Sequence, residues 1–296
     1  TTRVRVPRLG KKEILIRVEA AAVGEWDPAL IDGSFEDTRR KLPTVFGSDG
    51  AGVVEAVGPQ VTRFQPGDRV YGWGWGNKKG GFFAEYVAVK ETDAANVPAG
   101  LTIRQAAALP VSGITALQGL DRLGLVSGQN LLLIGASGGV GHIALQLARR
   151  LGLRVFAVAS GADGIELVKK LGADDAVEGH RGRFDMEAHA FAPDGFDGAL
   201  VFAGGDGWQL ALEQLKKGAK VIWPNGVEPE PIFPKGVKGR SYDGKCSPKD
   251  FERLNHLIAL GEFHVEVSRV YPLEHTADAV RDVQKHHLGK LEVQVH

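Results

Sequence analysis

The feature that most constrains the fold of this chain is a glycine-rich loop set between an apolar segment and a helix-like segment. Residues 130–134 are almost entirely apolar, which is typical of a parallel strand buried on both faces. The loop at residues 135–141 reads Gly-Ala-Ser-Gly-Gly-Val-Gly, residues 142–151 have helical spacing, and residues 154–159 form a second apolar run. A strand, a glycine loop, a helix and a second strand in this order predict a dinucleotide-binding unit.

Each glycine of this loop has an expected purpose. Gly135 permits the tight turn, Gly138 or Gly139 lets a pyrophosphate approach the backbone, and Gly141 lets the helix pack closely against the strand. The phosphates are expected at the helix N-terminus, where free N–H groups and the helix dipole favour anions. The coenzyme-binding residues expected in the loop are Gly135, Ser137, Gly138, Gly139, Val140 and Gly141. The alternative is an ordinary turn that binds nothing.

The end of the second strand bears on the choice of coenzyme. An NAD-binding unit usually has Asp or Glu there to hold the ribose 2′-hydroxyl, whereas this chain has Ser160 and Gly161. Small residues leave room for a 2′-phosphate, so we expect NADP(H), with NAD(H) as the alternative. Asp163 follows and would repel a phosphate if it pointed inward, so a basic partner must come from elsewhere. His180 and Arg181 are the candidates.

Composition excludes several classes of protein. The chain has 296 residues with 36 basic and 36 acidic side chains, and this neutral balance makes nucleic-acid binding an unfavoured function. Its single cysteine, Cys246, excludes an intrachain disulfide and a Cys₄ or Cys₂His₂ zinc site. No apolar run is long enough to span a membrane, and the N-terminus has no signal-like segment. A cytoplasmic enzyme is therefore expected, although the chain does not begin with Met.

The pattern of the chain changes near residue 113. Short β-branched runs broken by glycine dominate the first hundred residues and predict a small β-domain. Strand and helix patterns alternate afterwards, which predicts a doubly wound parallel sheet. A helix is expected over residues 208–215, and a further strand near the C-terminus.

Several motifs in fixed order resemble one known family. They are residues 47–58 (GSDGAGVVEAVG), 66–70 (PGDRV), 80–87 (GGFFAEYV), 109–116 (LPVSGITA), the glycine loop, 171–174 (LGAD), 215–218 (LKKG) and 289–293 (GKLEV). The series is similar to the medium-chain dehydrogenase/reductase superfamily, and most similar to its zinc-independent quinone oxidoreductases related to zeta-crystallin. The likeness covers nearly the whole chain.

The resemblance implies an α/β fold made of a GroES-like β-domain and an inserted Rossmann doubly wound parallel-sheet domain. The expected bounds are residues 1–106 and 268–296 for the first and 107–267 for the second, with the active site in the cleft between them. It also implies hydride transfer from NADP(H) to a small electrophile, a quinone or an α,β-unsaturated carbonyl. A homodimer pairing along residues 237–241 is expected, as are one or two strands before Thr1.

No metal is expected. Zinc-dependent relatives carry a Cys near Gly24 and a Gly-His-Glu near Gly47, whereas this chain has Gly24 and Gly47-Ser48-Asp49. Without a thiolate or imidazole there, catalytic zinc is disfavoured. The late histidines, which are His256, His264, His275, His286 and His287, have no zinc-binding spacing and are expected on the surface. A zinc-dependent alcohol dehydrogenase is the least favoured alternative.

The residues that would act on the substrate are harder to name. By the resemblance, Thr115 faces the nicotinamide, and Tyr242 is a candidate proton donor beside Tyr71 and water. The loops at Ala203 and Gly204 and at Trp223 and Asn225 follow expected strands, where such sheets bind ligands, so coenzyme contacts are expected there. Trp26, Trp73 and Trp75 either line a site for a planar substrate or pack a core.

Two departures from the quinone reductase pattern keep a second function open. The branch often has Asn near position 24 and Tyr in the turn after Gly33, whereas this chain has Gly24 and Phe35. The alternative is a catalytically weak NADP(H)-binding protein with a structural or RNA-associated role.

Overall fold

The chain folds into two compact units in a computed structural model that describes residues 2–34, 44–181, 184–205 and 208–296. The first unit comprises Thr1–Val111 and Cys246–His296, and the second comprises Ser112–Lys245. The helix at Pro248–Ala259 therefore has its contacts in the first unit, whereas the domain bounds expected from the sequence grouped it with the second.

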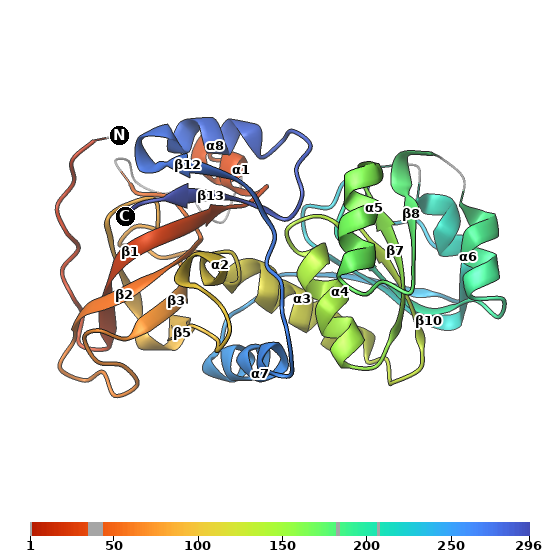
Figure 1. The fold of residues 1–296 in the computed structure, drawn as a ribbon, viewed down its shortest axis with the longest axis horizontal. Coiled ribbons are helices and arrows are strands. Elements are labelled where there is room, and N and C mark those ends of the chain that lie inside the picture. Colours follow the sequence, from red (N-terminus) through yellow and green to blue (C-terminus); the bar gives the residue numbers. More distant parts are fainter. Residues whose placement is uncertain (1, 35–43, 182–183, 206–207) are drawn as a thin grey trace. The chain divides into compact units, whose positions relative to one another are not determined.

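The first unit is built on a seven-stranded sheet. The strands lie in the order β12-β13-β1-β2-β3-β5, and β4 pairs with β1. The terminal strand β13 (Lys290–Gln294) runs antiparallel to β1 (Glu13–Val23), so the end of the chain returns to its beginning (Figure 1). The other strands are β2 (Asp49–Val57), β3 (Arg69–Trp73), β4 (Tyr86–Lys90), β5 (Ala94–Asn96) and β12 (Val267–Pro272).

Strand β1 shows why this sheet forms. Ile14, Ile16 and Val18 alternate with partly exposed residues, and their side chains enter the core of the unit. Short helices accompany the sheet. They are α1 (Asp27–Asp32), α2 (Ile103–Ala107), α7 (Pro248–Ala259) and α8 (Thr276–Asp282), with the 3₁₀ turns η2 (Glu91–Asp93) and η5 (Leu273–His275). Thr102 caps α2 in a capping box with Gln105, as its position in the sequence predicts.

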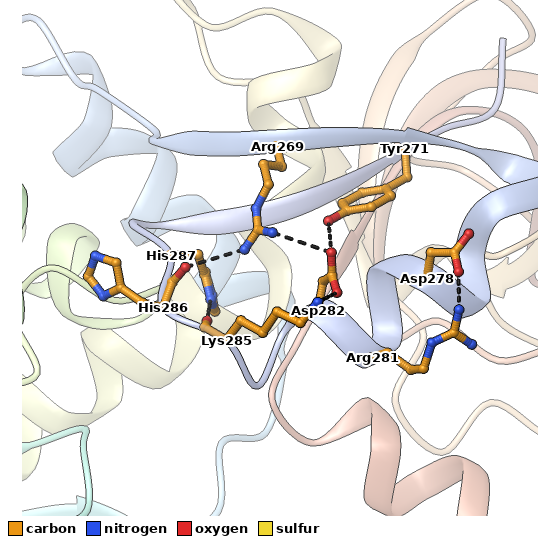
Figure 2. Close-up of polar contacts among 8 residues, drawn as sticks. All are labelled: Arg269, Tyr271, Asp278, Arg281, Asp282, Lys285, His286 and His287. Carbon is orange, nitrogen blue, oxygen red and sulfur yellow. Dashed lines mark hydrogen bonds and ion pairs between the residues drawn. The ribbon is translucent and has the colours of Figure 1, made fainter.

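Helix α8 is fastened to the edge strand β12 through one carboxylate. Asp282 accepts hydrogen bonds from the Tyr271 hydroxyl at 2.8 Å and from Arg269 at 3.3 Å, and pairs with Lys285 at 2.6 Å (Figure 2). These cations and the tyrosine hydroxyl hold the pKa of Asp282 below its usual range. His286 in the following loop is exposed, as expected from the sequence. The polar contacts around Asp282 therefore stabilise the packing of α8 against β12.

The second unit is an all-parallel sheet of six strands in the order β11-β10-β9-β6-β7-β8. Its strands are β6 (Asn130–Ile134), β7 (Arg154–Ala159), β8 (Asp175–Glu178), β9 (Phe196–Val201), β10 (Leu215–Pro224) and β11 (Lys238–Tyr242). Its helices are α3 (Pro110–Leu123, the first residues of which belong to the first unit), α4 (Gly141–Arg150), α5 (Gly161–Lys170) and α6 (Asp185–Phe191), with η3 (Gly179–Arg181) and η4 (Gln209–Gln214).

Strand order reverses around β6. The next strand in sequence, β7, pairs on one side of β6, and β9 pairs on the other, so this is the point at which open α/β sheets bind ligands. The α/β fold class predicted from the sequence is confirmed, with a β-rich unit and a parallel-sheet unit.

Three local expectations differ from the structure. The helix expected over 208–215 is the 3₁₀ turn η4, and β10 begins earlier than expected, at Leu215. Strand β4 begins at Tyr86 rather than near residue 83, because the backbone N–H groups of Phe82 and Phe83 donate instead to the carbonyls of Gly47 and Phe46.

Within the described residues, no helix has both the length and the apolarity to cross a membrane.

Candidate dinucleotide-binding site

The glycine loop has two positions that only glycine fits and one that is open. Gly135 has a φ of 75°, in the left-handed region, and a Cβ on it would lie 2.9 Å from the Cβ of Ala203. A Cβ on Gly141 would lie 2.0 Å from the carbonyl oxygen of Gly135, so glycine there lets α4 begin against the end of β6. A Cβ on Gly138 would meet only that same oxygen, at 3.5 Å. The backbone at Gly138 therefore has free space beside it, as a cradle for an anion requires.

A buried histidine stiffens this loop. The Nδ1 atom of His142 lies 2.8 Å from the carbonyl oxygen of Gly138, and the backbone N–H of His142 donates to the same oxygen at 3.1 Å. Because a carbonyl only accepts, Nδ1 carries a proton here. His142 is fully buried, and its own carbonyl accepts from Gln146 Nε2 at 2.9 Å. Sequence reasoning missed this residue, whose only signal is a histidine next to the last glycine.

Two serines join the glycine loop to the turn after β7. The backbone N–H of Ser160 donates to Ser137 Oγ at 3.2 Å, and Ser137 is buried. Ser137 therefore stabilises the glycine loop through a buried hydrogen bond and is not exposed at the loop surface. Ser160 Oγ lies 3.1 Å from Nε2 of His180, at the end of β8. The three residues bring the ends of β6, β7 and β8 together.

The charges at this edge are mixed. Oε1 of Glu178 accepts from the backbone N–H of His180 at 3.1 Å and, at 3.4 Å, from that of Gly161. Asp163 accepts a hydrogen bond from the backbone N–H of Gly164 at 2.9 Å, within the first turn of α5. Arg181 is the last residue of η3. Of the two candidate phosphate partners, His180 is the one with a contact to Ser160 in the structure.

A pocket of about 180 Å³ opens at the carboxyl ends of these strands. Of the expected coenzyme-binding residues, Gly135, Ser160, Ala203 and Gly204 line it. His180, which the sequence suggested as a phosphate partner, lines it as well. The remaining lining residues are Ile134, Val158, Ala159, Gly179, Gly205 and Trp208. Its walls are mainly apolar, which suits an organic ring more than a bare ion.

Trp208 is the main residue that sequence reasoning missed. Trp208 is 4% exposed, and its buried Nε1 has no hydrogen-bond partner among the described residues. Gly204, which lines the same pocket, has no room for a side chain, because a Cβ on it would lie 1.8 Å from the carbonyl oxygen of Glu228. The sequence shows Trp208 only as an aromatic residue at the start of an expected helix.

The residues expected after β10 do not line this pocket. Trp223 is buried and packs against Phe233, with ring centroids 6.2 Å apart. The backbone N–H of Asn225 donates to the carbonyl of Tyr242 at 3.0 Å, and its side-chain amide donates to Asp243 at 2.8 Å. Both residues therefore have local structural partners, and a coenzyme contact at either one stays a prediction.

The two candidate catalytic residues contact each other. The hydroxyl of Tyr242 donates to the backbone carbonyl of Thr115 at 2.6 Å, and Arg122 lies over the Tyr242 ring at 4.5 Å. Burial raises the pKa of Tyr242 well above its usual range. Tyr242 therefore holds β11 to α3, and its proton already has an acceptor within the protein.

A buried ion pair lies in the first unit at the position of the Gly-Ser-Asp motif. Asp49 Oδ1 accepts from the backbone N–H of Val111 at 2.6 Å, and Oδ2 lies 3.6 Å from Nζ of Lys290. Lys290 also lies over the ring of Trp26 at 4.5 Å. Burial raises the pKa of Asp49 to about 6, outweighing the opposite effect of Lys290. Among the described residues, no group of three or more His, Cys, Asp or Glu side chains could hold a metal ion.

The three tryptophans of the first unit differ in their exposure to solvent. Trp26 and Trp75 form an edge-to-face pair with centroids 5.8 Å apart, and both are partly exposed. Trp73 is buried in the first unit. Gly24 is also buried, and Phe35 lies outside the described residues.

Family models match both parts of the chain. Residues 10–99 match the alcohol dehydrogenase GroES-like domain, and residues 139–241 match a domain described as zinc-binding dehydrogenase. The solved quinone oxidoreductase from Coxiella burnetii is 26% identical and superposes with a TM-score of 0.87, over 99% of this chain and 93% of that one.

Curated relatives from plants are also similar. The 2-methylene-furan-3-one reductase of Solanum lycopersicum is 37% identical over 78% of this chain, which spans 59% of that relative's length. The chloroplastic NADPH-dependent alkenal/one oxidoreductase of Arabidopsis thaliana is 33% identical over 97% of this chain and 73% of its own length.

Proposed function

The chain belongs to the medium-chain dehydrogenase/reductase superfamily, in its quinone oxidoreductase-like branch, and from that premise we propose an NADPH-dependent reductase of quinones or α,β-unsaturated carbonyls. The observation that carries the proposal is the open backbone at Gly138, next to a pocket at the switch point of a parallel sheet. The names of the similar plant proteins, an alkenal/one oxidoreductase and a furanone reductase, supply the substrate class.

The residues present fit an NADP(H) molecule. The start of α4 and the loop residues Gly138, Gly139 and Val140 would hold the pyrophosphate, because the first N–H groups of a helix lack intrahelical acceptors. The pocket would take the adenosine half. Ser160 and His180 would face the 2′-phosphate, and Arg181, at the end of η3, is the second candidate partner. Glu178 lies close by and limits how strongly this edge can favour a phosphate.

The chemistry itself would come from the coenzyme, whose nicotinamide supplies a hydride when bound. The task of the protein is to position the acceptor and exclude water. Thr115 is proposed to lie on the nicotinamide side, and its position on α3 is held by the bond from Tyr242. The domain bounds expected from the sequence, 1–106 with 268–296 and 107–267, remain a proposal, and they differ from the two compact units in assigning α7 to the second domain.

Zinc independence is part of the proposal as well. Asp49 stands in the motif where zinc-dependent relatives have Gly-His-Glu, and its carboxylate is paired with the buried ammonium of Lys290. The chain therefore supplies its own cation to this carboxylate. Without a Lewis acid, an acceptor that is already electron-poor is the better substrate. Trp26 and Trp75 are proposed to offer a flat apolar surface to such a molecule.

Two further proposals concern assembly and location. Strand β11 lies at the edge of the six-stranded sheet and exposes Lys238, Gly239 and Arg240, so we propose that two copies pair along it. Light scattering of the pure protein would test this, and a monomer at all concentrations would contradict it. The cytoplasm is the proposed location, and cell fractionation that finds the protein in an organelle would refute it.

The function is tested by binding and turnover together. Fluorescence titration with NADPH and NADH should show binding of NADPH with the lower Kd. A panel of quinones and enones should then give NADPH oxidation, in protein shown by metal analysis to hold no zinc. NADPH binding with no turnover of any acceptor would favour the alternative of a catalytically weak binding protein. About one zinc per chain would favour an alcohol dehydrogenase.

A further inference from the structure

The start of α3 is capped by a residue from another part of the chain. Helices usually begin after a Ser, Thr, Asp or Asn whose side chain accepts from one of the first N–H groups, whereas Leu109 precedes Pro110 here and cannot accept. The acceptor is supplied by β2, since Oδ1 of Asp49 accepts from the N–H of Val111 at 2.6 Å. Asp49 is fully buried, which shields this bond from solvent. The helix that carries Thr115 therefore begins on a carboxylate from a distant strand.

The last strand of the chain fixes that carboxylate. Nζ of Lys290, on β13, lies 3.6 Å from Oδ2 of Asp49, and Lys290 is 3% exposed. Burial raises the pKa of Asp49 to about 6, so its carboxyl group is mostly ionised at pH 7. A charge-assisted hydrogen bond is about twice as strong as a neutral one, and an anion at a helix N-terminus is favourable. The ion pair therefore holds the start of α3 more firmly than a neutral side chain would.

The ammonium of Lys290 is fixed from a second side as well. It lies over the ring of Trp26 at 4.5 Å, and the face of an indole attracts a cation. The indole in turn lies against the backbone of Gly24, where a Cβ would come within 2.2 Å of the ring. Gly24 is one of the two departures from the quinone reductase pattern. A glycine there leaves the space that Trp26 needs in order to contact Lys290.

A second ion pair on β13 holds α2. Glu292 lies two residues after Lys290, so both side chains leave the strand on the same face. Oε1 of Glu292 accepts from Nε of Arg104 at 2.6 Å, and Glu292 is 2% exposed. The motif at residues 289–293 thus anchors the segment of α2 and α3 at two points, one on each helix.

We propose that Lys290 and Asp49 are positioning residues for the reaction: their ion pair fixes the first turn of α3 and thereby holds Thr115 on the nicotinamide side. Thr115 lies four residues after Val111, about one helical turn along α3, so a shift of the first turn is passed to it directly. The inference rests on the proposed function, because it needs Thr115 beside the nicotinamide. Lys290 and Asp49 act through the helix and take no part in the hydride transfer itself.

The test separates hydride transfer from coenzyme binding. Lys290→Met removes the ammonium with little change in side-chain length. Stopped-flow oxidation of NADPH at saturating NADPH and enone should then slow by at least about tenfold, because a small misplacement near the reacting atoms is costly. The Kd for NADPH should stay within about twofold of the wild-type value, since the glycine loop belongs to the second unit. Lys285→Met is the matched control, because Lys285 pairs with Asp282 on the surface of the first unit, and it should change neither value.

A double variant keeps the inference testable if Lys290→Met folds poorly. In Asp49→Asn combined with Lys290→Met no charge of this pair is left without its partner, so the fold should tolerate the change. Because the two residues act as a unit, the double variant should lose about as much of the rate as either single variant does.

Three results would overturn the inference while the proposed function stands. They are a wild-type rate in a folded Lys290→Met or double variant, a Kd for NADPH that rises as much as the rate falls, and a loss in the double variant equal to the product of the two single losses. Failure of the wild-type protein to reduce any enone or quinone with NADPH would refute the proposed function itself, and the inference with it.

Discussion

A carboxylate introduced at Gly138 should abolish coenzyme binding and leave the fold intact. A Cβ at this position would meet one atom, the carbonyl oxygen of Gly135 at 3.5 Å, which is an ordinary contact. The φ of Gly138 lies outside the left-handed region, so a side chain adds no backbone strain. We therefore expect Gly138→Asp to change the free energy of unfolding by no more than about 0.5 kcal/mol.

The effect on binding should be far larger. A carboxylate about 6 Å from a single phosphate charge costs about 3 kcal/mol at an effective dielectric constant of about 20. That energy raises the Kd for NADPH about 100-fold. Fluorescence titration measures the Kd, and thermal or urea unfolding measures the stability of the same preparation.

Two control variants separate charge from packing. Gly138→Asn has nearly the shape of Gly138→Asp without its charge, so it should bind NADPH far more tightly than the Asp variant. Gly141→Ala should instead lower the stability of the fold. Its Cβ would lie 2.0 Å from the carbonyl oxygen of Gly135 and must displace the start of α4. That change should lower the stability by about 1–3 kcal/mol. Wild-type affinity for NADPH in a folded Gly138→Asp protein would refute the assignment of the phosphate cradle.

Three other changes probe separate parts of the account. Tyr242→Phe should cost about 1 kcal/mol of stability by removing the bond to Thr115 and should leave kcat unchanged; a large fall in kcat would restore Tyr242 as a proton donor. His180→Gln should raise the Kd for NADPH about five- to tenfold and leave the Kd for NADH nearly unchanged, because only NADPH brings a 2′-phosphate to the ring that contacts Ser160; equal changes in the two Kd values would contradict this contact. Burial raises the pKa of Asp49 in the folded state to about 6, above its ordinary value, so the folded state holds the proton more tightly than the unfolded state does. The stability of wild type relative to Asp49→Asn should therefore fall by about 2 kcal/mol as pH rises from 4 to 7. A stability difference that stays constant in denaturant unfolding across that range would disprove the shift.

The sequence was most informative where structure is set by neighbouring residues. The run 130–159 combines buried strands, a glycine loop and a helix with 3.6-residue spacing, and the structure has β6, α4 and β7 there within a residue or so. The glycine spacing also predicted why Gly135 and Gly141 cannot carry a side chain. These features depend on short-range geometry, which the order of residues displays directly.

The sequence was least informative where distant segments meet. Lys290 reaches Asp49 only because β13 pairs with β1 next to β2, and no local pattern shows that pairing. Trp208 lines the same pocket as residues of β6 and β7, which are far away in sequence, and the helix expected at Trp208 is a 3₁₀ turn. Tyr242 shows the same limit, since its partner Thr115 lies on a helix far away in sequence.

The most direct test of the central claim follows the hydride. Reaction of the purified protein with NADPH that carries deuterium at both C4 positions of the nicotinamide, using an enone as acceptor, can be followed by mass spectrometry of the product. The account predicts a saturated carbonyl product that carries one deuterium on its β-carbon, formed without added metal. Binding of NADPH with no transfer of deuterium to any enone and no reduction of any quinone would contradict it.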